Sequence, residues 1–596
     1  MLRNLFVLYF ILMIYSLNAQ EVVSVLVSNP LLLEQAKINK NQSSLSLPFF
    51  DDFSYDSPSV DDNLWYNSSV YVNRNYPVNP PTVGVATFDG MDEKGFARSF
   101  SPPTDSEPSD TLLSRPIDLS GSNSVYFMFY YQAKGIGDSP QLQDTLILEF
   151  LNDTLGWQQV WSVGGHSMQE FKKVVQLIDA PIFLHEDFQF RFRNYATISG
   201  NFDHWHIDYV KIDNLLSSLD TSSLNDVAFI YNSPSFLERY SEMPWKHFIN
   251  NEYAELKDSI DIKLRNNGAS INVNYQYNVF ENNNQIFHYP TIGLSRNVSV
   301  LDYDSIGNYS FTDPSINVPS NVFNSFQPET ATFLVQNIIG TSLSDNKLND
   351  TLYHIQNFHF HFAYDDGTAE SAYGINVNGA KLAYEFKLNR PDTLRAVQMY
   401  FPQMLDTLND VDFYLTVWEG DNGNPGNIIY SQIVSPVHTA DGRYHTYYID
   451  NPFQIVGDFY VGWQQTTNDL LNIGLDKNNE ANDYMFYNVG AGWTMSSYPG
   501  SWMIRPVLSM NEITSGVRDF GSPIQIYPNP VDSEFFIENT HPDDVISIYS
   551  LQGMLVKRVI VNSTLSRVDV HNFSPGIYLL ELSNNNSKRY QKLIVK

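Results

Sequence analysis

The feature that most constrains the fold is an alternation of apolar and polar residues in short runs, separated by turn-forming residues. Near the C-terminus, Val545–Ser550 alternates in part, Ile577–Leu582 is a short and mostly apolar run, and Pro575-Gly576 supplies a turn before the second run. Successive side chains of a strand point to opposite faces of a sheet, so such runs predict half-buried strands. Because similar runs recur between turn residues along the chain, we predict an all-β protein.

Length and composition indicate several β-sandwich domains. A chain of 596 residues is too long for one hydrophobic core. It contains 37 Tyr, 39 Phe and 9 Trp but only 17% charged residues, and aromatic side chains suit the half-buried surface of a sheet. There is no cysteine, which excludes disulfides and a lipid anchor on an N-terminal Cys. Ordinary cores or bound ions must therefore hold the fold together.

The net charge of −31 is unevenly distributed. Residues 524–596 contain seven basic and seven acidic residues, so the whole acidic excess lies in the remainder of the chain. An acidic body repels nucleic acids and anionic membranes, and favours cations or neutral glycans as ligands. We therefore expect no nucleic-acid partner.

The N-terminus has the pattern of a signal peptide. Arg3 precedes the apolar stretch Leu5–Leu17, and Leu17-Asn18-Ala19 ends in a small residue suited to cleavage. The apolar stretch is too short to span a bilayer, and no later stretch approaches the required length. We predict a signal peptide at 1–19 and no membrane span in the mature chain.

Four sequence blocks at the C-terminus occur in a characteristic order and spacing. They are Ile526–Pro530, Val545–Gly553, Ser574–Tyr578 and Lys592–Lys596. In sequence, this region closely resembles the type A C-terminal sorting domain of the type IX secretion system of Bacteroidota. The resemblance implies a small β-sandwich at 524–596, the type IX machinery as its partner, and a secreted or outer-surface location.

A first domain is predicted at 47–214. It opens with Pro48–Phe53 and closes with Phe202–Ile212, where alternation places Trp205, Ile207 and Tyr209 on one face. The opening and ending resemble MAM-like and cleaved-adhesin jelly rolls of the concanavalin A type. The resemblance implies a jelly-roll sandwich.

Two further domains are predicted before the sorting domain. Strand-like runs and the turn Asn266-Asn267-Gly268 favour an immunoglobulin-like spacer sandwich at 226–360. The segment 362–510 begins with an aromatic residue and Asp365-Asp366, as the first domain does, and contains a long Gly/Asn-rich turn at 419–426. It resembles the carbohydrate-module-like jelly rolls of secreted bacterial proteins, so we predict a second jelly roll.

Acidic residues at the openings and ends of the two jelly rolls are candidate ligands of structural Ca²⁺, which takes six to eight oxygen ligands. The candidates in the first domain are Asp51 and Asp52 with Asp203 or Asp208. The candidates in the second jelly roll are Asp365, Asp366 and Glu370 with an acid such as Asp476 or Asp483. The alternative is that these residues only form turns or cap strands.

Aromatic and histidine residues suggest two further sites. Trp463, Trp493 and Trp502 are candidate exposed rings that stack on sugars, although most Trp in a sandwich pack in the core. His204 with His206, and His359 with His361, would share a face of a strand and could bind a transition metal. With no third ligand recognisable, ordinary solvated or groove-lining positions are the simpler interpretation.

A triplet of Asp, Ser or Thr, and an apolar residue occurs eight times, above the two or three expected from composition. It resembles the O-glycosylation sequon of Bacteroidota periplasmic and surface proteins. The alternative is a strand start, where an Asx-turn precedes a β-branched residue. The candidate acceptors are Thr111, Thr145, Thr154, Ser259, Ser305, Thr351, Thr393 and Thr407.

Catalytic motifs are missing from the sequence. His185-Glu186 lacks the second histidine of a zinc protease, and Gly165–Gln169 lacks the final glycine of a nucleophile elbow. A glycosidase needs only two carboxylates, and nothing singles out a pair. We therefore expect an adhesin-like protein that binds glycans or surface polymers. The alternatives are a secreted glycosidase-like hydrolase and a structural component of a surface layer.

Overall fold

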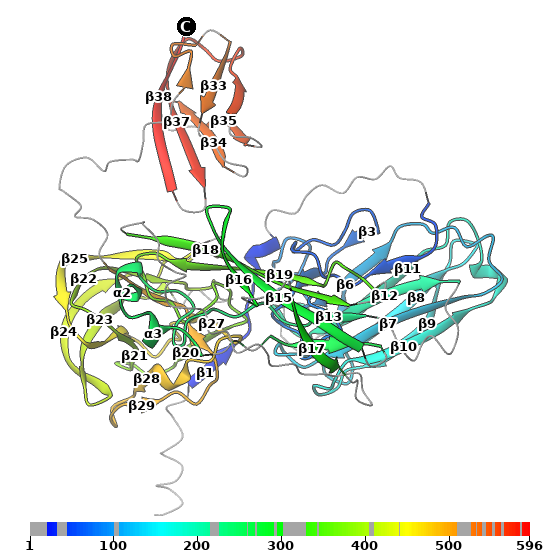
Figure 1. Ribbon diagram of the computed structural model, residues 1–596, viewed down its shortest axis with the longest axis horizontal. Coiled ribbons are helices and arrows are strands. Elements are labelled where there is room, and N and C mark those ends of the chain that lie inside the picture. Colours follow the sequence, from blue (N-terminus) through cyan, green and yellow to red (C-terminus); the bar gives the residue numbers. More distant parts are fainter. Residues whose placement is uncertain are drawn as a thin grey trace, which may run out of the picture. The chain divides into compact units, whose positions relative to one another are not determined.

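The computed structural model forms two compact units, residues 1–509 and 510–596. It describes the chain except for residues 1–20, 33–43, 100–105, 215–225, 259, 261, 269–270, 291–294, 302–328, 342–344, 404–409, 440–441, 509–525, 532, 539–543, 551–554, 562–564 and 585–586. Nearly all regular structure consists of antiparallel strands (Figure 1), which confirms the all-β, multidomain prediction. No helix within the described ranges is long and apolar enough to cross a membrane.

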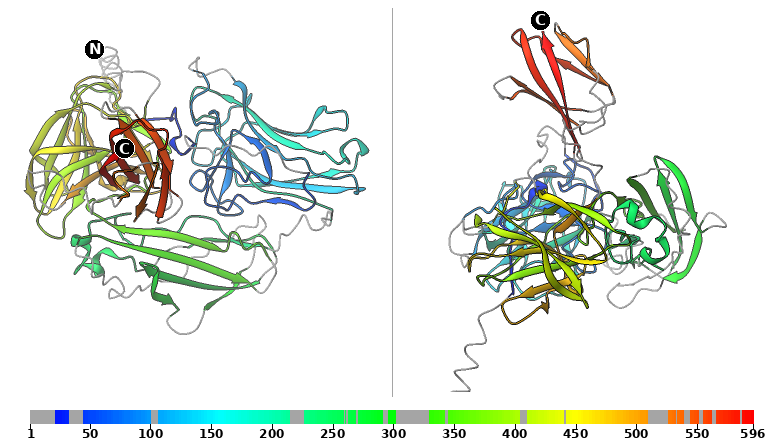
Figure 2. Two further views of the ribbon diagram at one scale, coloured as in Figure 1. Left: turned by 90° about the horizontal axis from the view of Figure 1, so that it is seen from above. Right: turned by 90° about the vertical axis from the view of Figure 1, so that its left-hand side faces the viewer.

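Two sheets form the first sandwich, coloured blue to cyan in Figure 2. The first has the order β10-β7-β12-β5-β4 with β2 beside β12, and the second β3-β6-β11-β8-β9. The bounds are β2 Phe49–Asp51, β3 Trp65–Ser68, β4 Tyr71–Asn73, β5 Val85–Phe88, β6 Ser106–Ser114, β7 Val125–Ala133, β8 Thr145–Leu151, β9 Trp157–Gly164, β10 Lys172–Ile178, β11 Phe190–Thr197 and β12 Trp205–Asp213. Their inward side chains form one core rich in aromatic residues, including Trp65, Phe127, Phe190 and Trp205.

The closing strand β12 departs from the predicted alternation. Its register with β7 shifts between Asp208 and Lys211, and Tyr209 has a φ of 54°. A β-bulge of this kind turns the following side chains to the other face of the sheet. Val210 therefore joins Trp205 in the core, while Tyr209 packs in a separate cluster with Tyr130. The prediction that Tyr209 shares a face with Trp205 is wrong for this reason.

The middle region contains a five-stranded sheet of order β16-β15-β18-β19, with β17 also beside β15. A two-stranded sheet and two short helices accompany it. The bounds are β13 Val227–Phe229, α2 Trp245–Phe248, α3 Glu252–Glu255, β14 Leu264–Asn266, β15 Ile271–Glu281, β16 Asn284–Tyr289, β17 Arg296–Leu301, β18 Ala331–Thr341 and β19 Thr351–Phe358. Trp245 and Phe248 pack on Phe358, so α2 covers part of this sheet.

The next region forms sheets of order β24-β23-β26-β21-β28-β29 and β25-β22-β31, and contributes β20, β27 and β30 to a third sheet. The bounds are β20 Ser371–Ile375, β21 Lys381–Lys387, β22 Asp392–Met399, β23 Phe413–Asp421, β24 Asn424–Val434, β25 His445–Ile455, β26 Asp458–Gln464, β27 Ile473–Asp476, β28 Met485–Asn488, β29 Thr494–Met495, β30 Ser501–Trp502 and β31 Ile504–Leu508. Its core is continuous with that of the middle region. We call this region the third sandwich.

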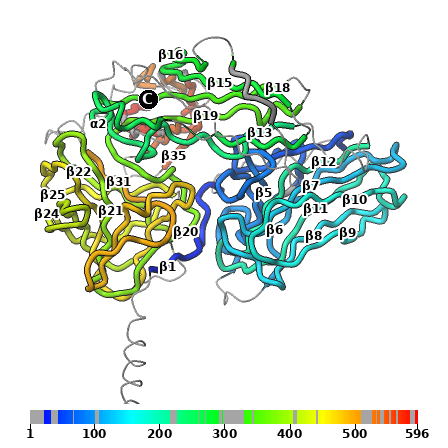
Figure 3. Tube along the Cα trace, turned by 60° about the horizontal axis from the view of Figure 1, so that its bottom comes forward, coloured from blue at the N-terminus to red at the C-terminus, as the bar shows by residue number. Residues whose placement is uncertain are grey.

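The sheet containing β20 begins with a strand from the start of the described chain. β1 (Glu21–Ser24) pairs antiparallel with β20, so the sheet has the order β1-β20-β27-β30 (Figure 3). Residues 20–46 lie outside the domains predicted from sequence. The structure places the first of them in a sheet with residues about 350 positions away.

The second unit is a small sandwich of a three-stranded sheet, β32-β33-β36, and a four-stranded sheet, β35-β34-β37-β38. The bounds are β32 Ile526–Tyr527, β33 Glu534–Glu538, β34 Val545–Ser550, β35 Leu555–Ile560, β36 Leu565–Asp569, β37 Gly576–Asn584 and β38 Ser587–Val595. Phe535, Ile548, Leu580 and Leu593 lie in its separate core. The strand predicted at 577–582 lies within β37.

Candidate functional site

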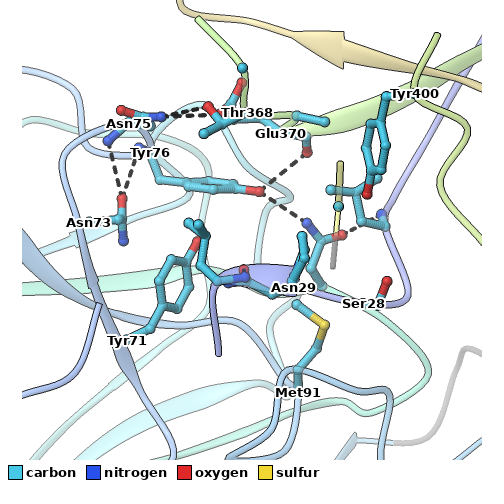
Figure 4. A pocket seen from close by; sticks show the side chains of 17 residues that line it. Ser28, Asn29, Tyr71, Asn73, Asn75, Tyr76, Met91, Thr368, Glu370 and Tyr400 are labelled. Carbon is cyan, nitrogen blue, oxygen red and sulfur yellow. Dashed lines mark hydrogen bonds between the residues drawn. The ribbon is translucent and has the colours of Figure 1, made fainter. Parts of the chain in front are cut away.

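A pocket of about 110 Å³ lies among three segments of the first unit (Figure 4). One wall is the N-terminal segment from Leu26 to Leu31, a second is β4 with the turn after it, and a third is the turn 367–370 that leads into β20. Its polar lining includes Ser28, Asn29, Asn73, Asn75, Thr368 and Glu370. Its aromatic and apolar lining includes Leu26, Tyr71, Tyr76, Met91 and Tyr400.

Tyr76 connects two walls of the pocket (Figure 4). Its ring stacks on the buried imidazole of His204, with 4.9 Å between ring centroids. Its hydroxyl accepts a hydrogen bond from Asn201 Nδ2 at 3.2 Å and lies 3.4 Å from the carbonyl oxygen of Glu370. The ring is therefore fixed by the first sandwich while its hydroxyl reaches the third.

The turn after β4 positions the amides of the pocket. Asn73 Oδ1 accepts hydrogen bonds from the backbone N–H groups of Asn75 and Tyr76, at 3.3 and 3.1 Å. Such local bonding is why asparagine favours turns. The turn directs Asn75 Nδ2 to Thr368 Oγ1 at 2.8 Å and to Glu370 Oε1 at 3.4 Å.

Glu370 is the acid of this pocket. Burial, and after it the neighbouring Asp366 carboxyl, raise its pKa to about 7, against hydrogen bonds from the Lys477 backbone and Thr368 that lower it. Burial also raises the pKa of the Tyr71 and Tyr76 hydroxyls well above the usual value, so both stay neutral. The pocket therefore offers neutral hydroxyls, amides and ring faces beside an acid that is protonated in part near neutral pH.

The acids predicted in the second jelly roll lie close together. The Asp366 backbone N–H donates to Asp476 Oδ2 at 2.8 Å, and burial together with Asp366 and Glu370 raises the pKa of Asp476 well above its usual value. Asp365 pairs with the half-buried Arg505 guanidinium. The other candidate, Asp483, lies on the short 3-10 helix Asn482–Tyr484.

The acids predicted in the first domain separate into different groups. Asp51 accepts a hydrogen bond from Trp65 Nε1 at 2.7 Å, and burial raises its pKa to about 7. Asp52 accepts from Asn349 Nδ2 at 3.1 Å and raises the pKa of the buried Asp208. Asp203 lies elsewhere.

Asp203 accepts hydrogen bonds from the Thr197 backbone N–H at 2.7 Å and from Gln141 Nε2 at 3.0 Å. Thus Asp52 and Asp208 are near each other, while Asp51 and Asp203 are bound by other donors. Among the residues that the structure describes, no group of three or more His, Asp or Glu is arranged to hold a metal ion. The histidine pairs, 6.3 and 6.4 Å apart between ring centroids, belong to no such group. Calcium binding stays a prediction.

The three predicted platform tryptophans differ in burial. Trp463 and Trp502 are both 0% exposed and lie in the core of the third sandwich, where Trp502 packs on Tyr373 at 5.0 Å. The expectation of exposed rings is wrong for these two, because their side chains point from β26 and β30 into the core. Trp493 is half-buried and packs edge-on against Trp418 on the other face of the sheet. Only Trp493 remains a candidate platform.

The candidate glycosylation triplets occupy several settings. Thr145 and Thr351 begin β8 and β19, Thr393 lies at the second position of β22, and Thr111 lies within β6. Thr154 is exposed on a turn, where its hydroxyl donates to Asn152 Oδ1. Ser259, Ser305 and Thr407 lie outside the described residues. Modification stays a prediction, and several triplets do coincide with strand starts.

The pocket residues carry no motif that predicts a common site. Asn73 and Asn75 after a strand are a turn signal, but their partners in the turn 367–370 are about 290 positions away. The segment that closes the pocket, residues 26–31, has no motif of its own. Only the fold brings these three segments together.

The comparisons with known proteins identify the C-terminal unit. Residues 525–596 match the model of the secretion system C-terminal sorting domain, and this region is a type IX sorting domain, as predicted. The domain implies export of the chain to the cell surface or the medium by the type IX machinery. No curated protein matches the chain.

Several solved structures show weak similarity. The CBM22-1–GH10 modules of xylanase 10B from Clostridium thermocellum match with 11% identity and a TM-score of 0.17, over 35% of this chain and 30% of that one. The CBM22 tandem of Paenibacillus barcinonensis Xyn10C matches with 7% identity and a TM-score of 0.18, over 73% of this chain and 100% of that one. The BSP domain of a biofilm-associated protein matches with 10% identity and a TM-score of 0.12, over 94% and 98%.

We predict that Trp463→Ala lowers the free energy of unfolding by about 3–5 kcal/mol, because it leaves a large cavity in the core. Trp493→Ala should cost only about 1 kcal/mol, roughly the value of one aromatic pair. Denaturant unfolding of the two variants measures both. A large loss for Trp493→Ala would show that this ring is also part of the core.

We predict that Glu370 makes stability depend on pH. Its pKa is raised from 4.5 to about 7 on folding, so its stabilising contribution is complete below about pH 4.5 and is lost as pH rises through 7. Glu370→Gln should therefore become more stable relative to wild type between pH 5 and 8, by at most about 1.4 kcal/mol per pH unit. Melting curves of wild type and Glu370→Gln at pH 5 and pH 8 measure this. A stability difference between the two proteins that is the same at both pH values would contradict the prediction.

Proposed function

We propose that this exported protein is adhesin-like and binds extracellular glycans or surface polymers through the pocket of Figure 4. The main support for the proposal is the set of side chains that line the pocket. Ligand sites are concave, occur between structural modules, and combine apolar and aromatic walls with a few placed polar groups. This pocket meets each of these criteria.

A sugar unit is the ligand class that best fits the lining. The rings of Tyr71, Tyr76 and Tyr400 suit the apolar face of a sugar, as amphipathic aromatic side chains do in general. Asn29 and Asn75 are among the amides that can bond to hydroxyl groups. The acidic surroundings, with Glu370 in the wall, disfavour anionic polymers. The small volume of the pocket favours the terminal sugar unit of a glycan over an internal unit.

A hydrolase is the second candidate function, and one observation favours it. A carboxyl group with a pKa near 7 in a pocket has the property required of a general acid, and burial gives Glu370 this property. A glycosidase needs a second carboxylate across the scissile bond. The described lining contains no other carboxyl side chain than Glu370, so binding is the leading proposal.

Filling the pocket tests the proposed site. In the mature chain, Ser28→Trp should place a large ring in the cavity and reduce binding on a glycan array at least about tenfold, whereas Ser28→Ala should retain binding. Ser28 is suitable because it lines the pocket and is only partly buried. Equal binding by the two variants would exclude this pocket as the site. Release of reducing ends that is abolished in Glu370→Gln would favour the hydrolase.

Deletion of the sorting domain tests whether it directs export. We predict that a chain lacking 524–596 folds its first unit but accumulates in the periplasm, because the sorting domain is a separate compact unit with its own core. Cell fractionation and immunodetection measure the location. The full chain serves as the control, and unchanged delivery of the truncated chain to the surface or medium would contradict the assignment.

Structural Ca²⁺ remains a proposal for the acids at the jelly-roll openings. An ion bound only by the folded chain raises the melting temperature by mass action, so a chelator should lower it. The paired variants Asp51→Ala with Asp52→Ala, and Asp365→Ala with Asp366→Ala, should each reduce that response. Melting curves of the mature chain that coincide with and without chelator would leave only the turn-forming role.

A further inference from the structure

We propose that the third and first sandwiches together form a binding site for an extended peptide, and that the chain occupies this site with its own residues 21–32. We call these residues the N-terminal strap. The site would take a peptide with an acidic first residue and apolar anchors at fixed positions. This inference does not depend on the glycan proposal, although the strap also forms a wall of the pocket.

The first half of the strap completes a sheet of the third sandwich. Four residue pairs, from Glu21↔Ile375 to Ser24↔Ala372, align β1 with β20 (Figure 3). All five residues of β20 are buried, and its other edge pairs with β27. Without β1, the outer edge of β20 would expose unpaired backbone groups, which is the template that an added strand recognises.

The side chain of Glu21 fixes the register of this pairing. Its carboxylate accepts a hydrogen bond from the Tyr373 hydroxyl at 2.6 Å and another from the Ser496 hydroxyl. The Tyr498 hydroxyl lies 3.4 Å from the Glu21 carbonyl oxygen. The Ser497 hydroxyl lies 3.5 Å from the second carboxylate oxygen, so four hydroxyl groups of the third sandwich surround Glu21. This makes an acidic first position a requirement for the peptide.

The second half of the strap binds the first sandwich through its backbone. Leu26 N–H donates to Asn201 Oδ1 at 2.7 Å, and Asn201 N–H donates to the Leu26 carbonyl at 2.8 Å. Ala97 N–H donates to the Val27 carbonyl at 3.1 Å, and Asn29 N–H to the Gly95 carbonyl at 2.7 Å. The strap is therefore bonded through its main chain along most of its length.

Leu32 is the apolar anchor at the end of the strap. It is 1% exposed and packs with Tyr71, Tyr76 and Ile136, whereas the adjacent Leu31 is 52% exposed. Main-chain bonds that give affinity and side-chain pockets that give selectivity are the hallmarks of β-strand addition. Because the strap is tethered to the chain, it occupies the site at a high effective concentration.

Cutting the tether in the folded chain tests the proposal. A protease site is placed within residues 33–43 of the otherwise complete mature chain, the folded protein is cleaved, and gel filtration with mass spectrometry measures the strap that remains bound. We expect the wild-type and Leu31→Asp straps to stay with the protein, and the Leu32→Asp strap to be lost. A labelled synthetic peptide of residues 21–32 should bind cleaved wild-type protein from which the strap has been displaced, at least about tenfold more tightly than its Leu32→Asp form.

Two results would overturn the proposal. One is immediate loss of the wild-type strap with no binding of the labelled peptide, while circular dichroism shows that the sandwiches remain folded. The other is equal retention of the Leu31→Asp and Leu32→Asp straps together with equal binding of the two peptides. The peptide measurement uses a protein that folded with its own strap, so a folding defect of the Leu32→Asp chain does not affect it.

Discussion

The antiparallel pairing of β1 with β20 joins the start of the described chain to a sheet that is otherwise built from residues after 370. From this sheet the N-terminal strap continues to the first sandwich, where its backbone bonds at Leu26, Val27 and Asn29. Two sandwiches that are far apart in sequence are thereby linked by one segment. The pocket exists where they meet, because the strap, the turn after β4 and the turn before β20 form its walls.

Buried carboxyl groups are the second constraint on this chain, which has no disulfide to stabilise it. Asp51, Asp208, Asp476 and Glu370 are each buried, and burial raises the pKa of each. Most of these groups accept hydrogen bonds from backbone N–H groups or nearby side chains of turns, which offsets part of the cost of burial. Their roles are consistent with the turn-forming interpretation, and the calcium proposal adds an ion to the same positions.

Local pattern was sufficient for much of the fold. The run predicted as a strand at 545–550 is β34, and the run at 577–582 lies within β37, because short apolar runs between turn residues suit the buried faces of a sheet. The position of β1 was not predictable, since its partner is about 350 positions away and pairing between distant strands leaves no local signal. The bulge at Tyr209 was missed because alternation assumes an unbroken register.

The site was less predictable than the fold. Trp463 and Trp502 could not be distinguished from an exposed platform by sequence, because a strand with alternating residues does not reveal which face the core occupies. The sequence could not show that Trp65, Asn349 and Arg505 act as partners of the acidic pairs, because these residues lie far from the pairs in sequence or carry no motif. The pocket residues became visible only when three distant segments were brought together.

In this structure the N-terminal strap holds the edge of the third sandwich and the adjoining wall of the pocket. Amide hydrogen exchange of the full mature chain and of a chain lacking residues 21–32 tests this most directly, because exchange reports local opening segment by segment. In the chain that lacks the strap, we expect protection to fall in β20 and in the turn 367–370 and to stay unchanged in β8 and β9 of the first sandwich. Equal protection of β20 in the two chains would contradict it.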